Sequence, residues 1–237
     1  MTDSSAERRA LMLREMGLTP QWHLRHPSAA APVHALVAGE SAAAEADEAA
    51  VVPPVAEPTQ ERRALIMDMD WTRLRNDVSA CTACALHARR TKTVFGVGDE
   101  NADWLFVGEG PGADEDAQGE PFVGQAGKLL DSMLAAIQLQ RGHNVYIANV
   151  VKCRPPNNRN PEAGEALACE PYLHRQIELI KPKLIVALGK VAAVNLLTRD
   201  ASVANMHNKV HRYRDIPLIV TYHPAYLLRS PQKKARA

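Results

Sequence analysis

The chain has 237 residues, of which 46% are hydrophobic and 23% are charged, so it is long enough for one globular domain with an additional segment. Its formal net charge of +1 excludes a strongly basic or acidic protein overall. No run reaches the roughly 18 apolar residues that cross a membrane, and the N-terminus lacks the apolar core of a secretory signal. We therefore expect a cytoplasmic protein, in a bacterial-type cytosol, with no membrane partner.

The first 65 residues have the composition of an extension. Residues 28–50 contain eleven alanines, and residues 51–60 contain three prolines. A segment with so few large apolar groups cannot bury enough surface to offset the entropy lost on ordering. The sequence predicts a short helix and an Ala/Pro/Glu-rich, largely disordered linker over residues 1–65, followed by one domain over residues 66–237. It identifies no partner for this extension.

Four apolar runs follow in the domain, each almost unbroken, as in strands that are covered on both faces. They occupy residues 104–109, 145–151, 183–189 and 218–223. Apolar residues at helical spacing lie between these runs. Strands that alternate with helices predict a three-layer α/β/α fold around a central four-stranded parallel sheet.

Ligands of an open parallel sheet bind beyond the carboxyl ends of its strands. The first run leads into GEGPG at residues 108–112, the second carries Asn149, and the fourth leads into His223. We therefore expect Glu109, Asn149 and His223 to face one crevice. The GEGPG loop lacks the G-x-G-x-x-G spacing of a dinucleotide site, which argues against a nucleotide cofactor.

Phe122 lies between two glycines in GEPFVG, outside any periodic pattern. Two interpretations remain open for it: a core aromatic that holds the loop on the sheet, or a platform on which a base stacks.

The four cysteines all lie in the predicted domain, as Cys81 and Cys84 and then as Cys153 and Cys169. Disulfides are rare in the cytosol. Zinc usually takes two close pairs of ligands, whereas an iron–sulfur cluster tolerates irregular spacing. Both groups stay open, and the wide second pair favours the cluster.

Positive charge gathers near the C-terminus. Residues 205–237 hold seven Lys or Arg against one Asp, a net charge of +6. This segment is either a solvated tail or a contact for an anionic partner.

Together these motifs resemble the family 4 uracil-DNA glycosylases, the iron–sulfur members of that superfamily. The resemblance covers residues 71–229 and rests on CTAC, on TVFGVGDENADWLFVGEGPGADEDAQGEPFVGQAGKLL, on VYIANVVKCRPPNNRNP, on the second cysteine pair and on TYHPAYLLR. It implies excision of uracil from single- or double-stranded DNA as a step of DNA repair, and we expect the protein to act as a monomer. Gly110 departs from the alanine that members often carry.

The resemblance also implies roles for individual residues. Cys81, Cys84, Cys153 and Cys169 would bind a [4Fe–4S] cluster. Uracil would contact Glu109, Gly110, Pro111, Phe122, Asn149 and His223, with Glu109, Asn149 and His223 catalytic. From the residues themselves we expect Leu227 to enter the vacated base stack and Arg229 and Lys233 to meet phosphates. Either Leu227 or Leu228 must instead pack the last helix onto the sheet. A purely structural role for Glu109, tying down the glycine loop, stays open.

Two other functions would explain part of the sequence. An iron–sulfur redox protein would use the cysteines but would leave Asn149 and His223 without a role. A nucleic-acid-binding module with a structural cluster would need no catalysis.

Overall fold

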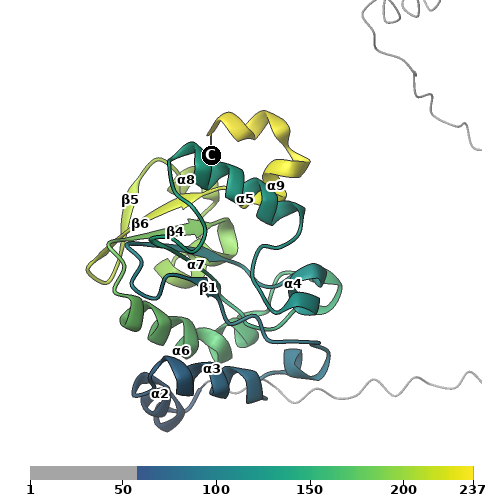
Figure 1. Cartoon of the computed structure of the whole chain (residues 1–237), viewed down its shortest axis with the longest axis vertical. Coiled ribbons are helices and arrows are strands. Elements are labelled where there is room, and N and C mark those ends of the chain that lie inside the picture. The colour runs from purple at the N-terminus through teal and green to yellow at the C-terminus, as the bar shows by residue number, and fades with distance from the viewer. Residues whose placement is uncertain (1–57, 237) are drawn as a thin grey trace, which may run out of the picture. The chain divides into compact units, whose positions relative to one another are not determined.

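The structure, a computed structural model, describes residues 58–236 (Figure 1). The short helix and nearly all of the linker that the sequence predicts lie outside these residues. The helices are α2 (Gln60–Met67), α3 (Trp71–Ala80), α4 (Ala113–Gln118), α5 (Gln125–Ala136), α6 (Ala163–Ile180), α7 (Lys190–Leu197), α8 (Val203–Met206) and α9 (Pro224–Arg229), with short 3-10 turns η1 (Ala85–Ala88), η2 (Pro156–Asn158) and η3 (Pro231–Arg236). Among the described helices, none has the length and apolar character needed to span a membrane.

One six-stranded sheet forms the centre of the domain. Its strands are β1 (Val97–Gly98), β2 (Trp104–Gly108), β3 (Val145–Asn149), β4 (Leu184–Leu188), β5 (Val210–Tyr213) and β6 (Ile216–Thr221), in the order β1-β3-β2-β4-β6-β5. The four inner strands are parallel, and β1 and β5 pair antiparallel at the two edges. Successive strands are added on opposite sides of β2, so the sheet has a switch point beside β2 where a crevice is expected.

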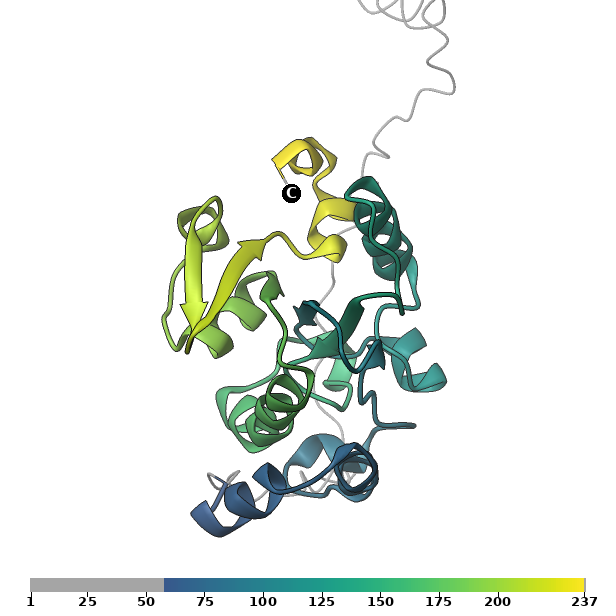
Figure 2. The same ribbon diagram turned by 60° about the vertical axis from the view of Figure 1, so that its left-hand side comes forward.

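Side chains that alternate along each strand divide the core between the two faces of the sheet. Leu105 and Val107 of β2 belong to the larger cluster, which includes residues of α3, α6 and α7, whereas Phe106 packs with Leu130 and Leu134 of α5. Figures 1 and 2 show α5 and α6 on opposite sides of the sheet, with α2 and α3 beyond α6. The structure therefore confirms the predicted three-layer α/β/α fold.

The four predicted strands are the four parallel strands, and the two antiparallel edge strands were not predicted. β1 has only two residues, and β5 alternates exposed and half-buried residues in the sequence VHRY. Neither carries the apolar run that marks a strand covered on both faces.

Helix α2 crosses the predicted boundary between residues 65 and 66. It packs on α6, where Ile66 is buried, Arg62 Nη1 donates to the carbonyl oxygen of Ala168 at 2.9 Å, and Arg63 pairs with Glu170. The ordered domain thus includes residues 60–65, which the sequence analysis assigned to the extension. Long-range contacts join α2 to the domain, and the sequence QERRALIM, half polar and half apolar, does not reveal them.

Candidate active site and cysteine site

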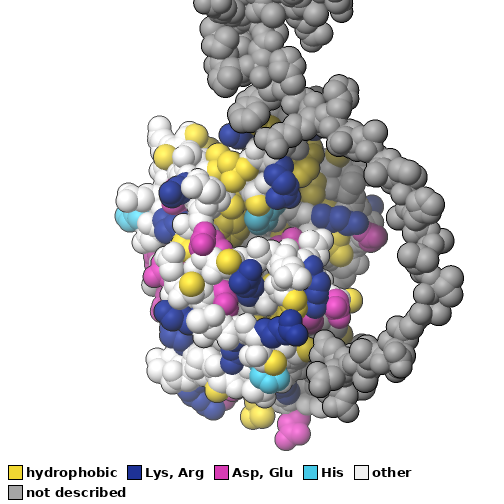
Figure 3. All heavy atoms as spheres, turned by 90° about the vertical axis from the view of Figure 1, so that its right-hand side faces the viewer, with side chains coloured by type: hydrophobic (Ala, Val, Ile, Leu, Met, Phe, Trp, Pro, Cys, Tyr) yellow, Lys and Arg dark blue, Asp and Glu magenta, His cyan; other side chains and the backbone are white. Residues whose placement is uncertain are grey.

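The carboxyl ends of the parallel strands open into a cleft of about 770 Å³. Its wall includes all six residues predicted to contact the substrate base: Glu109, Gly110, Pro111, Phe122, Asn149 and His223. Figure 3 shows one face of the molecule, where hydrophobic side chains and a histidine border a hollow and Lys and Arg side chains lie around it. The topology therefore brings together residues that are up to 114 positions apart in the sequence, from Glu109 to His223.

Asn149 ends β3 with its side chain in the cleft wall. It is 2% exposed, and its Oδ1 atom is buried without a hydrogen-bond partner among the described residues. A buried amide oxygen normally has a partner, so this atom is available to a ligand. Gly108 makes room for the arrangement, because a Cβ atom there would lie 2.4 Å from Asn149 Oδ1 and 2.6 Å from the ring of Phe122.

His223 caps the N-terminus of α9. Its Nδ1 atom accepts a hydrogen bond from the backbone N–H of Ala225 at 3.2 Å, and its carbonyl oxygen accepts those of Tyr226 and Leu227. Burial, assisted by the positive charge of Arg229, lowers the pKa of His223 to about 4. The imidazole is therefore neutral at pH 7, and because Nδ1 accepts, its proton lies on Nε2, which can donate.

Phe122 is held beside His223 in a constrained loop. The two ring centroids are 5.5 Å apart with an interplanar angle of 31°, and the backbone φ of Phe122 is 56°, a value that non-glycine residues rarely adopt. Arg141 donates to the carbonyl oxygens of Pro121 and Phe122, at 2.8 Å each. The absence of a side chain at Gly127 lets α5 pass against the Phe122 carbonyl, where a Cβ atom would come within 1.8 Å.

The acids of the glycine loop have separate roles. The Glu115 carboxylate accepts hydrogen bonds from the backbone N–H groups of Gly112, Val123 and Gly124, and so ties the loop to the segment that carries Phe122. Glu109 lines the cleft instead, and burial raises the pKa of its carboxyl group. Neither Glu115 nor Arg141 was predicted as a site residue; the spacing of Glu115 three residues after Gly112, typical of a helix cap, was the available signal.

The predicted DNA contacts differ in accessibility. Leu227 is 1% exposed, so it is the one of the two leucines that packs inward, and its side chain is not accessible to DNA in this structure. Its neighbours Tyr226 and Leu228 are 38% and 41% exposed. Arg229 and Lys233 line the cleft.

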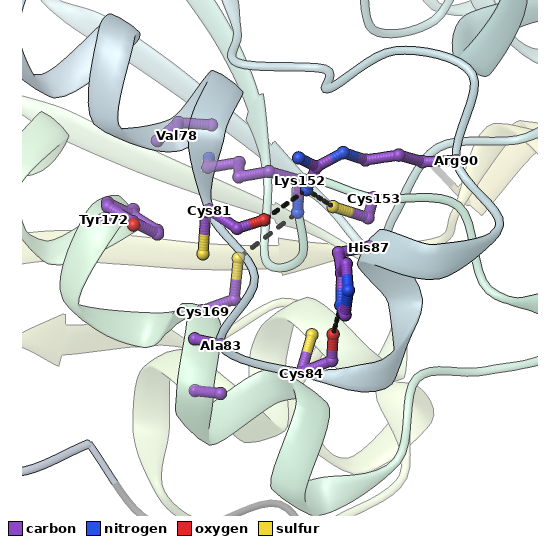
Figure 4. Close-up of a pocket in the computed structure, with 11 residues that line it drawn as sticks. Val78, Cys81, Ala83, Cys84, His87, Arg90, Lys152, Cys153, Cys169 and Tyr172 are labelled. Carbon is purple, nitrogen blue, oxygen red and sulfur yellow. Dashed lines mark hydrogen bonds between the residues drawn. The ribbon is translucent and has the colours of Figure 1, made fainter. Parts of the chain in front are cut away.

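The four cysteines surround one small cavity that shares no lining residue with the cleft. Cys81 and Cys84 follow α3, Cys153 follows β3, and Cys169 lies on α6. Figure 4 shows their sulfur atoms around a common space. Within residues 58–236, no three Cys, His, Asp or Glu side chains converge closely enough to hold a single metal ion.

The surroundings of the cysteines favour a negatively charged occupant. Arg90 Nη1 donates to Cys153 Sγ at 3.2 Å, Arg62 Nη2 lies 3.9 Å from Cys81 Sγ, and the Lys152 backbone N–H donates to Cys169 Sγ at 3.3 Å. Burial raises the pKa of Cys169 to about 12, so a metal would have to displace its proton. No carboxylate lines the described cavity. These features fit a thiolate-bound metal group, whose sulfur atoms commonly accept such hydrogen bonds.

An α/β/α domain with a cleft at its strand ends and a separate cysteine site belongs to the class of open-sheet ligand-binding domains. The sequence profile of the Uracil DNA glycosylase superfamily matches residues 95–237. The chain belongs to this superfamily, which confirms the resemblance found in the sequence.

Three curated relatives are Type-4 uracil-DNA glycosylases. The protein from Archaeoglobus fulgidus is 48% identical over 164 residues, which cover 66% of this chain and 82% of the relative. The protein from Sulfurisphaera tokodaii is 44% identical over 167 residues, covering 67% of this chain and 76% of the relative. The protein from Pyrobaculum aerophilum is 43% identical over 171 residues, covering 69% and 87%.

Proposed function

We propose that this protein is a DNA-repair hydrolase that flips uracil out of DNA and hydrolyses its N-glycosidic bond, leaving an abasic site. Membership of the superfamily and the relatives named as Type-4 uracil-DNA glycosylases support this function. The observation that carries it is the buried, unpartnered Asn149 Oδ1 atom in the wall of the cleft that also holds the Phe122 ring and the neutral His223.

In this proposal Asn149 distinguishes uracil from cytosine. Its amide offers one acceptor and one donor, which match the N3–H and O4 groups of uracil. Cytosine presents the opposite pattern at both positions. Each mismatched contact costs roughly 1–3 kcal/mol, and more when a buried group is left unpaired.

His223 would stabilise the departing base. The glycosidic bond breaks with negative charge on uracil and positive charge on the sugar, so a preorganised donor acts mainly in the transition state. The Nε2–H of a neutral imidazole can donate to a uracil carbonyl oxygen without transferring its proton. Glu109, which lines the same cleft, would orient water or stabilise the cationic sugar.

A uracil inside a duplex must first leave the base stack, at a cost of a few kcal/mol. We propose that the exposed Tyr226 and Leu228 fill the vacated space, while Arg229 and Lys233 contact phosphates. The ring of Tyr226 stacks on Tyr222 with centroids 5.6 Å apart, which would keep it in place. The protein would act as a monomer beside the nucleoid in a bacterial-type cytosol.

Cys81, Cys84, Cys153 and Cys169 are proposed to hold a [4Fe–4S] cluster, with a zinc ion bound by the same four thiolates as the alternative. When bound, the cluster would crosslink α3, the segment after β3 and α6. Purified protein should then be yellow-brown with about four iron atoms per chain. A colourless, active protein that contains zinc would overturn this assignment.

Incubation with a uracil-containing oligonucleotide, followed by alkali, tests the proposed activity. We expect strand cleavage at the uracil, and none with a matched cytosine oligonucleotide. Binding without cleavage would instead support a nucleic-acid-binding module. Reversible reduction of bound iron, with neither binding nor cleavage, would support a redox protein.

A further inference from the structure

Lys152 connects the cysteine site to the proposed uracil pocket. Its side chain is 1% exposed, and its Nζ atom donates to the carbonyl oxygen of Asn149 at 2.9 Å and to Gln176 Oε1 at 2.7 Å. Its backbone N–H donates to Cys169 Sγ at 3.3 Å. One residue thus contacts both a predicted metal ligand and the main chain of the residue proposed to read the base.

The ammonium group of Lys152 lacks an ordinary counter-ion. None of the salt bridges found in residues 58–236 includes it, and both of its acceptors are neutral. A buried charge is costly unless a nearby opposite charge compensates it. The candidates for that charge are the sulfur atoms of Cys153 and Cys169, which line the same cavity as Lys152 (Figure 4).

The other partners of Lys152 are buried and hydrogen-bonded to the rest of the domain. Gln176 is fully buried on α6 and donates from Nε2 to the Phe95 carbonyl oxygen at 2.9 Å, and the Lys152 carbonyl oxygen accepts from the Val94 N–H at 2.8 Å. Gln176 thus offers the ammonium a second acceptor, whereas the ammonium itself holds the Asn149 carbonyl oxygen. A change in the cysteine site that moves Lys152 would alter the position of Asn149.

We propose that Lys152 is a positioning residue that couples occupancy of the cysteine site to uracil recognition by Asn149. The inference rests on the proposed function of Asn149. Lys152 does not line the cleft where the reaction would occur. Its ammonium group compensates the negative charge of the thiolate-bound group, and its hydrogen bond to the Asn149 carbonyl oxygen orients that peptide. Coupling of this kind is reciprocal, so uracil in the cleft must also stabilise the bound metal.

The test measures metal release from the purified holoprotein to a chelator, with and without free uracil. In the wild type, uracil should slow the release and cytosine should not. In Lys152→Met, which keeps most of the length of the side chain but removes its charge, the protection should disappear. The affinity for free uracil and the single-turnover rate of excision should both fall about 10- to 100-fold. A loss of this size is typical when a residue that positions a binding residue, without touching the ligand itself, is replaced. Binding to uracil-free DNA should stay unchanged.

Gln176→Met is the matched control, because it disturbs the same buried network but leaves the bond from Lys152 to Asn149. It should lower stability yet keep the affinity for uracil and the protection of the metal. Equal losses in both variants would overturn the proposal, as would a Lys152→Met protein with normal uracil affinity. If Lys152→Met fails to fold, the wild-type arm decides: a wild type that excises uracil but shows no protection refutes the coupling. A wild type that neither binds nor excises uracil refutes the proposed function instead.

Discussion

The backbone N–H of Ala225 donates to Nδ1 of His223 at 3.2 Å, and this bond determines which nitrogen of the imidazole faces a ligand as a donor. Pro224 follows the histidine at the first position of α9 and has no N–H of its own, so the next free donor of the helix is that of Ala225. The sequence His-Pro-Ala therefore sets the tautomer of His223 as well as its position.

Replacing His223 by Ala should slow single-turnover excision about 100- to 1000-fold, the usual loss for one preorganised donor. Affinity for DNA should change little, because phosphate contacts dominate it. Rapid-quench assays under saturating enzyme measure the rate, and fluorescence anisotropy measures the affinity. A variant that excises uracil at the wild-type rate would leave His223 only its role as a helix cap.

Acid should destabilise the protein partly through His223. The pKa of this residue is about 4 in the folded protein, below the value of about 6.5 in an unfolded chain. The unfolded state then binds more protons between these values, so the free energy of unfolding falls as the pH decreases from about 6.5 to 4. Denaturant titrations at several pH values measure this slope, which should be smaller in His223→Gln. An equal slope in both proteins would assign the acid sensitivity to other groups.

Replacing Arg229 by Ala should have the opposite pattern to the loss of His223. It should weaken DNA binding similarly for all sequences and reduce the slope of log affinity against log salt by about 1. The chemical step should change less. Because the charge of Arg229 helps to lower the pKa of His223, that pKa should rise in the variant, as an NMR titration of the ring can measure. Unchanged salt dependence would exclude a phosphate contact.

Truncation distinguishes the extension from the domain. Deleting residues 1–57 should leave excision on short oligonucleotides nearly intact, because their composition predicts a linker and a short helix outside the domain. Deleting residues 1–69 also removes α2, which covers α6 and places Arg62 near Cys81. The longer deletion should lower the melting temperature and speed loss of the bound metal. Equal behaviour of the two truncated proteins would show that α2 contributes nothing to the cysteine site.

The sequence predicted those parts of the structure that depend on residues close together along the chain. Unbroken apolar runs marked the four parallel strands, and the positions of Glu109, Asn149 and His223 at the ends of those runs placed them in one cleft. Lys152 carried no such signal: a lysine next to a cysteine is typical of a surface segment, and only the packing of α6 shows that it is buried. The burial of Leu227 likewise depends on how α9 meets the sheet, which a six-residue helix does not reveal by its periodicity.

The space at Gly108 limits how this cleft can change. A single added carbon there would overlap both the amide oxygen of Asn149 and the ring of Phe122, which come from separate segments of the chain. The hydrogen-bond recognition proposed for Asn149 and a stacking role for Phe122 would therefore share one backbone position, and a side chain at residue 108 would disturb both. A change in base preference would have to arise through residues outside β2. Arg141 and Glu115 are examples, because they hydrogen-bond to the main chain of the loop that carries Phe122.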